Sequence, residues 1–181
     1  MGPRDPVEAH RASTPLELFF DLCFVVAVAQ AGSSLHHALI ENHSGDAVSA
    51  FPFVFFSIWW AWMNFTWFAS AYDNDDIVYR IAVLVQIGGA LILAAGVPRA
   101  FDDRDFVVTA VGFCVMRFAL VSMWIRAAVE HREGRPSAIR YAIGVAACQV
   151  GWVTMILLPH AVQVMGWAVL VPLELLVPVW A

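Results

Sequence analysis

Residues 13–25 read STPLELFFDLCFV, an apolar run that opens with helix-start signals and contains two acids. Thr14 is a favourable N-cap, Pro15 fits the first helical position, and Glu17 lies three residues after the cap. This spacing is a capping box, which satisfies backbone N–H groups that lipid could not satisfy. Asp21 lies one turn beyond Glu17, so we expect both acids on one helix face. A helix start explains Glu17 but not Asp21, and we interpret Asp21 as the first sign of a polar interior.

The composition around this stretch is that of a membrane protein. Of the 181 residues, 61% are hydrophobic and only 14% are charged, whereas charged residues form about a quarter of an average soluble domain. One crossing needs ~20 residues, so the length suits six helices with short connections. We therefore predict an all-α, polytopic transmembrane bundle of about six spans. The net charge of −5 gives no support for nucleic-acid binding.

Polar turns and prolines divide the chain into a tail and six helices. We expect residues 1–13 to form an N-terminal tail and residues 14–181 to form the bundle. A cleavable signal peptide is the alternative for the first segment, but Asp21 in the middle of its apolar run argues against it. Pro98 is expected to end the third helix. The helices are predicted at about 14–40, 47–72, 78–97, 106–129, 137–158 and 161–181.

The arginines near the ends of the helices indicate the orientation, because arginine is enriched in cytoplasmic loops. With the N-terminus inside, Arg99 and Arg104 are the arginines of the outer side. The inner side then holds Arg4, Arg11, Arg80, Arg126, Arg132, Arg135 and Arg140. We therefore predict that both termini are cytoplasmic and that the protein is a multi-pass protein of the inner (plasma) membrane.

Polar residues inside the predicted helices gather in the cytoplasmic half of the membrane. An arginine at a helix centre costs about 2.5–3.5 kcal/mol on insertion scales. Arg117 should therefore face the bundle and pair with a carboxylate, for which Asp21 and Glu174 are closest in depth. The candidate ion- or substrate-binding residues are Glu17, Asp21, Asn64, Arg117 and Glu174.

Two hypotheses explain this cluster. It forms either a transporter- or channel-like polar cavity, or a structural charge network that only specifies helix packing or interaction. An enzyme would need a nucleophile with a base, or a set of metal ligands, and the sequence offers neither. We expect no catalytic residues, no metal and no cofactor.

An acidic turn follows the second helix and carries Asp73, Asp75 and Asp76, with Arg80 one turn later. Carboxylate oxygens at this spacing suit a divalent cation. The same acids also suit the positive end of the next helix dipole, and we favour this capping role. The aromatic residues of the second helix either line a groove or face lipid, and we favour lipid and interface contacts for most of them.

These segments together closely resemble the bacterial low temperature requirement A proteins. The resemblance covers nearly the whole chain. It is carried by TPLELFFDL (14–22), WWAWMNFTWF (59–68), YDNDD (72–76) followed by Arg80, MR (116–117) and LEL (173–175).

The resemblance implies a multi-span membrane protein connected with growth in the cold, without a firmly assigned activity. Its signature residues coincide with the acidic turn and the polar cluster described above. Members of this family are typically about twice as long as this chain and have a second helical half. We therefore expect, besides the lipid bilayer, a second helical half or a homo-oligomer as partner.

Overall fold

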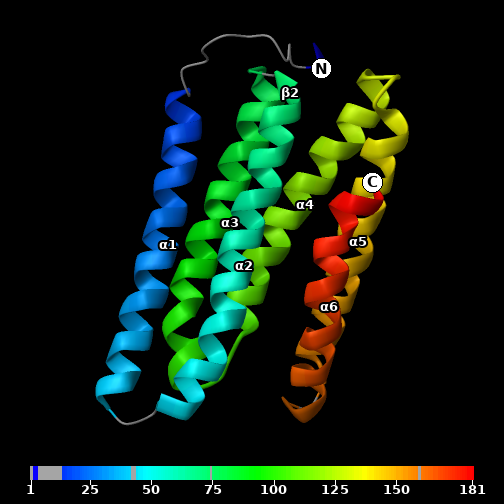
Figure 1. Cartoon of the computed structure of the whole chain (residues 1–181). Helices are drawn as coiled ribbons and strands as arrows, with labels where there is room; N and C mark the ends of the chain where they lie inside the picture. Colours follow the sequence, from blue (N-terminus) through cyan, green and yellow to red (C-terminus); the bar gives the residue numbers. More distant parts are fainter. Residues whose placement is uncertain (1, 4–13, 42–43, 74, 159) are drawn as a thin grey trace.

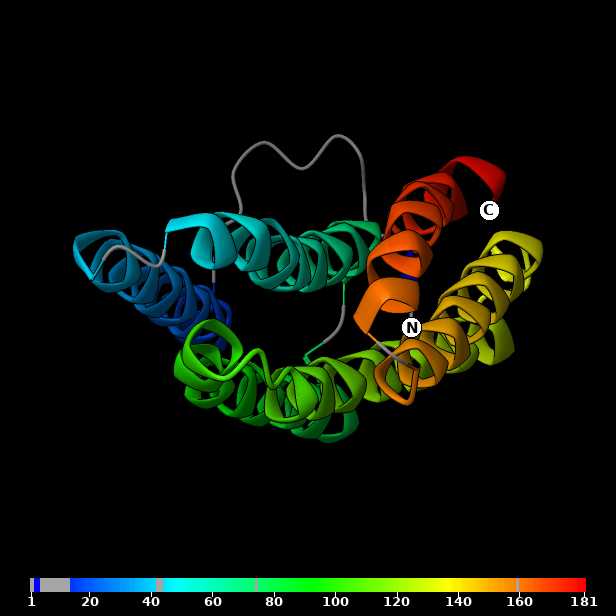
Figure 2. The same ribbon diagram turned by 90° about the horizontal axis from the view of Figure 1, so that it is seen from below.

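The computed structural model describes residues 2–3, 14–41, 44–73, 75–158 and 160–181. Within these ranges the chain runs up and down through long helices that lie in two rows (Figures 1 and 2). One row holds α1, α2 and α6, and the other holds α3, α4 and α5. The helices are α1 (Pro15–Ile40), α2 (Ser44–Ala71), α3 (Ile77–Asp102), α4 (Val107–Glu130), α5 (Arg135–Ile156) and α6 (His160–Trp180).

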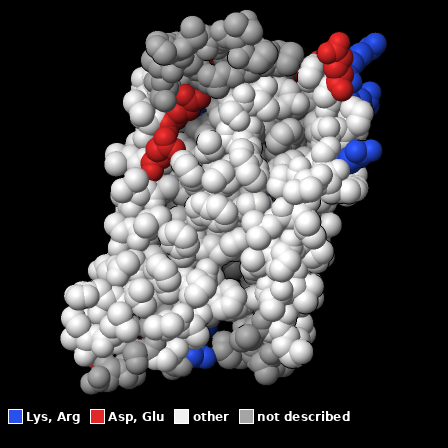
Figure 3. All heavy atoms as spheres, viewed as in Figure 1, with Lys and Arg blue, Asp and Glu red and all other residues white. Residues whose placement is uncertain are grey.

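The predicted all-α membrane bundle is confirmed. The first five helices are each long and apolar enough to cross a membrane, whereas the apolar part of α6 is shorter, Met165–Trp180. Two short strands, β1 (Gly2–Pro3) and β2 (Tyr72–Asp73), pair antiparallel at one end of the bundle. Figure 3 shows that Arg, Asp and Glu side chains lie toward the ends of the visible face, while the described residues in its middle are uncharged.

The helix start at Thr14 has the predicted capping box. The Glu17 backbone N–H donates to Thr14 Oγ1 at 3.2 Å, and the Thr14 N–H donates to Glu17 Oε2 at 2.9 Å. The first turn therefore satisfies its own donors before the chain enters lipid.

Most predicted helix bounds agree with the structure to within a few residues, but the predicted end of the third helix is wrong. α3 continues through Pro98 to Asp102. Its last turns bury Val97, Ala100 and Phe101, and this packing outweighs the backbone hydrogen bond that proline removes. The second helix also begins three residues earlier than predicted, at Ser44.

Glycines allow α3 and α4 to pack with their backbones in contact. A Cβ on Gly112 would lie 2.6 Å from the Gly89 carbonyl oxygen and 2.8 Å from the Leu93 Cα. These are backbone atoms, so a side chain there would force the helices apart. Gly88, next to Gly89 in the chain, has no neighbour within 4 Å of an added Cβ.

Gly112→Ala should therefore lower the free energy of unfolding by about 1–3 kcal/mol, the usual cost of overpacking. The matched control is Gly88→Ala, which adds the same methyl group in open space and should be neutral or slightly stabilising. Denaturant titration of the purified protein in detergent measures both. Equal effects of the two substitutions would show that the close contact of α3 with α4 does not matter for stability.

The predicted capping role of the acidic turn is confirmed at Asp76. Its carboxylate accepts a hydrogen bond from the Tyr79 backbone N–H at 2.8 Å and also pairs with Arg126 of α4. The Arg126 guanidinium and the Tyr79 N–H hold the pKa of Asp76 well below its ordinary value. This interaction connects the start of α3 to the end of α4.

Because the pKa of Asp76 is lowered in the folded state, its contribution to stability is complete above the unfolded pKa and is lost as the pH falls below about 4. The Asp76 side chain is 41% exposed, so solvent screening limits the effect to about 0.5–1 kcal/mol. We expect the melting temperature of the wild type to fall more steeply than that of Asp76→Asn between pH 5 and pH 3. Parallel melting curves against pH would contradict this assignment.

Candidate functional site

A buried ion pair lies near the middle of the bundle. Arg117 of α4 donates through Nη2 to Glu174 Oε2 of α6, and each side chain is only 1% exposed. Arg117 lies ten residues after the start of α4 and thirteen before its end, which places the pair deep in the membrane. Of the two candidate partners of Arg117, Asp21 and Glu174, it is Glu174 that forms the pair.

Two tryptophans complete the hydrogen bonding of the Glu174 carboxylate. Trp60 Nε1 of α2 donates to Oε2 at 2.7 Å, and Trp152 Nε1 of α5 donates to Oε1 at 3.1 Å. The carboxylate thus accepts from three donors that belong to three other helices. This saturates a group whose burial would otherwise be costly.

The guanidinium of Arg117 is satisfied only in part. Its Nε and Nη1 atoms are buried and have no hydrogen-bond partner in the described part of the chain. The Phe113 ring lies one turn away, with its centroid 5.1 Å from Arg117 Cζ, and gives a cation–π contact. The site therefore has surplus donors and no matching acceptor.

A second hydrogen-bonded group adjoins the ion pair. Asn64 Nδ2 donates to the Trp60 carbonyl oxygen at 2.7 Å, and Tyr141 Oη of α5 donates to Asn64 Oδ1 at 2.5 Å. The Trp124 ring stacks on Tyr141 with centroids 4.4 Å apart. The polar network therefore connects α2, α4, α5 and α6 through side chains and the Trp60 carbonyl oxygen.

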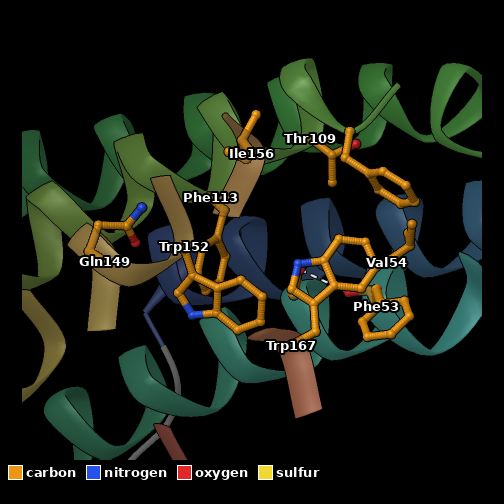
Figure 4. Close-up of a pocket in the computed structure, with 11 residues that line it drawn as sticks. Phe53, Val54, Thr109, Phe113, Gln149, Trp152, Ile156 and Trp167 are labelled. Carbon is orange, nitrogen blue, oxygen red and sulfur yellow. Dashed lines mark hydrogen bonds between the residues drawn. The ribbon is translucent and has the colours of Figure 1, made fainter. Parts of the chain in front are cut away.

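A cavity of about 50 Å³ lies next to this network, between α2, α4, α5 and α6 (Figure 4). Phe113 and Trp152 line it and also contact the ion pair. Two buried polar atoms at its wall, Thr109 Oγ1 and Gln149 Oε1, have no partner within the described chain. The volume and the unpaired atoms suit bound water.

The structure places Asp21 away from this site, so the prediction that Asp21 could pair with Arg117 is wrong. Asp21 is exposed on α1 and accepts a hydrogen bond from Trp62 Nε1 at 2.8 Å. Glu17, one turn earlier, is used by the helix cap. The predicted membrane depth of Asp21 is similar to that of Arg117, but depth alone does not show which helices are neighbours. In the structure α1 packs on α2 and α3 rather than on α4.

The acidic turn also lies apart from the ion pair. Asp75 makes two hydrogen bonds to Arg80, at 2.9 and 2.7 Å, and Asp76 is held by Arg126. The side chain of Asp73 lies outside the described residues. Among the residues that were placed, no three or more His, Cys, Asp or Glu side chains come together as metal ligands.

The lipid and interface contacts expected for most aromatic residues of the second helix do not extend to two residues near the site. Trp60 and Phe68 are 2% and 0% exposed. Tyr141 and Trp152 also belong to the network, although the sequence pattern alone did not identify them. Their spacing offered a signal, because eleven residues are about three helical turns and place both side chains on one face of α5.

Comparison with known proteins identifies the family of this chain. The family model of the bacterial low temperature requirement A protein matches residues 12–181. The uncharacterized protein RA0937 of Rhizobium meliloti (strain 1021) is 27% identical over 175 residues. That alignment covers 94% of this chain but 41% of the relative, so the chain spans less than half of the relative's length. No solved structure matches.

Removing one charge of the pair should have unequal effects. Glu174→Gln keeps an acceptor oxygen for one of the two tryptophans but leaves a guanidinium that cannot deprotonate, so it should cost about 3–5 kcal/mol of unfolding free energy. Arg117→Met should cost less, because the remaining carboxyl group keeps two indole donors and can become neutral. The double variant should recover most of the Glu174→Gln loss. Titration with a denaturing detergent measures all three, and additive effects would exclude coupling between the charges.

Proposed function

The chain belongs to the bacterial low temperature requirement A protein family, and we propose that this multi-pass membrane protein binds and passes a polar solute or ion at Arg117 and Glu174. In this transporter- or channel-like role Glu174 is the ionisable group, Arg117 is its counter-ion, and Asn64 is a polar contact. Asp21 and Glu17 have no direct part in it, because α1 holds them away from the pair.

The observation that carries the proposal is the imbalance between the two partners. Glu174 accepts from three donors, whereas Arg117 leaves two nitrogens without acceptors. An ion pair that serves packing alone is stable when both partners are fully bonded. Surplus donors beside a mainly aromatic cavity with two unpaired polar atoms suit a solute that brings acceptor oxygens, or a file of water molecules.

The cavity supports an approach from one side. Thr109 lies near the start of α4 and Ile156 is the last residue of α5, so the cavity lies in the half of the bundle away from the start of α1. With the N-terminus in the cytoplasm, this is the outer half. We therefore propose access from the outer side of the ion pair, in place of the cytoplasmic-half cavity expected from the sequence.

A structural role is the second candidate, and the sealing of the pair favours it. Arg117 and Glu174 are almost inaccessible, and α6 packs chiefly on α5. The hydrogen bonds of Glu174 to Trp60 and Arg117 then hold α6 against the remaining helices. In this case the charges specify packing and no solute passes.

The remaining parts of the proposal concern the setting of the protein. We propose the inner membrane as its location, with both termini in the cytoplasm, and a role in growth at low temperature without enzymatic activity. The described arginines support this orientation, since those of the α3 start and the α4–α5 link share the end of the bundle where α1 begins. As partners we propose the lipid bilayer and either a second helical half or a second copy of the chain.

Flux measurements in reconstituted vesicles test the transport role. The probes are protons, followed with an entrapped pH dye, and radiolabelled acetate and inorganic phosphate as anions. We expect wild-type protein to pass at least one probe above the level of protein-free vesicles. The variant Arg117→Met/Glu174→Gln should lose this flux while remaining folded, because it keeps an acceptor oxygen for one tryptophan and buries no unpaired charge.

The matched control is Glu133→Gln, which removes an exposed carboxylate from the α4–α5 link and should leave the flux unchanged. If the charge-free variant passes the probes like the wild type, or if none of them crosses with wild-type protein, the structural role is the better explanation of the site.

A further inference from the structure

A groove on the outside of the bundle, between α1 and α2, combines a carboxylate with tryptophans and apolar side chains. Its volume is about 430 Å³. α1 and α2 run antiparallel, and the Asp21–Trp62 hydrogen bond marks one end of the groove. From there the apolar lining, which includes Phe24, Val28 and Phe55, extends along both helices.

Asp21 is the residue of this groove that indicates a ligand. It lies inside a membrane-spanning helix, yet its carboxylate is exposed and its only partner in the described chain is the Trp62 indole. One neutral donor does not compensate an ionised carboxylate next to lipid. By contrast, the buried carboxylate of Glu174 is stabilised by the Arg117 cation and by two indole donors. Asp21 has no cation among the described residues.

The depth of Asp21 matches the membrane interface. α1 has 26 residues, or about 39 Å at 1.5 Å per residue, against a hydrocarbon core of ~30 Å. Asp21 comes six residues, or about 9 Å, after Pro15. If the excess length of the helix is shared equally between its two ends, Asp21 therefore lies roughly 5 Å below the edge of the hydrocarbon core. Lipid headgroups are within reach at this level, and tryptophan is enriched there.

We propose that the α1–α2 groove binds a zwitterionic phospholipid, with its ammonium group at Asp21 and one acyl chain along the apolar lining. The carboxylate supplies the opposite charge, and the faces of Trp59 and Trp62 supply cation–π contacts. The groove opens toward the side of the bundle, where the bilayer lies. Asp21 repels the headgroup of a net anionic lipid. This inference does not depend on the proposed transport role.

A second groove in the same protein provides an internal control. It lies between α4 and α5 and has a similar volume of about 370 Å³. Its lining is also apolar, with Val121, Ile125 and Ile143, but its charged member is Arg135 instead of an acid. The same argument predicts the opposite headgroup preference there.

The test compares phosphatidylethanolamine and phosphatidylglycerol that carry the same photoactivatable acyl chain. Each is added to the purified full chain in detergent, and labelled residues are mapped by mass spectrometry. At the α1–α2 groove we expect about fivefold more labelling by phosphatidylethanolamine, the ratio suited to an exposed ion pair with a cation–π contact. At the α4–α5 groove we expect no such preference, or its reverse.

Asp21→Asn should bring the ratio at the α1–α2 groove to about one and leave the α4–α5 groove unchanged. Trp62→Phe, which keeps the carboxylate and the apolar bulk, should lower the ratio in part. If Asp21→Asn does not fold, the comparison of the two grooves in the wild type decides alone. Equal labelling of the α1–α2 groove by both lipids overturns the proposal. So does its protection from both lipids by a second copy of the chain, detected as a protein–protein cross-link at the same residues.

Discussion

The pairing of Arg117 with Glu174 constrains how the helices around it are arranged. A guanidinium cannot lose its charge at any pH in a cell, so an arginine in the middle of an apolar helix requires a fixed acceptor. Glu174 provides it only because α6 lies opposite α4, and α6 is held there by donors from α2 and α5. The position of four helices is thus coupled to the satisfaction of one carboxylate.

The packing of α3 on α4 depends on small residues instead of on a buried ion pair. Apart from the Asp76–Arg126 pair at one end, their contact uses no charge described above, and it depends on the absence of side chains at Gly89, Gly96 and Gly112. In lipid, close packing of backbones replaces the hydrophobic effect as the source of helix association. Small residues thus bring α3 and α4 together, whereas large aromatic and polar side chains connect α6 to α2 and α4.

The sequence was sufficient for features that depend on local spacing or on burial cost. The capping box at Thr14, the number and approximate bounds of the helices, the cap at Asp76 and the need of Arg117 for a carboxylate all belong to this class. The choice between Asp21 and Glu174 depends on which helices are neighbours, and depth alone does not determine this. The same limit applies to Trp60 and Trp152, whose indoles meet at one carboxylate from helices far apart in the chain. Pro98 shows the reverse case, in which tertiary packing overrides a local stop signal.

The separation of the ion pair along the chain has a consequence for biosynthesis. Arg117 and Glu174 are 57 residues apart, and at a synthesis rate of ~5–20 residues per second the second charge emerges roughly 3 to 11 seconds after the first. During this interval α4 resides in the translocon or at its lipid boundary with an arginine that has no acid to pair with. α4 is by then able to pack on α3 through its glycines, which hold it in place until α6 arrives. The glycine contact and the ion pair thus act in succession, and the order of the helices in the chain is part of how the bundle assembles.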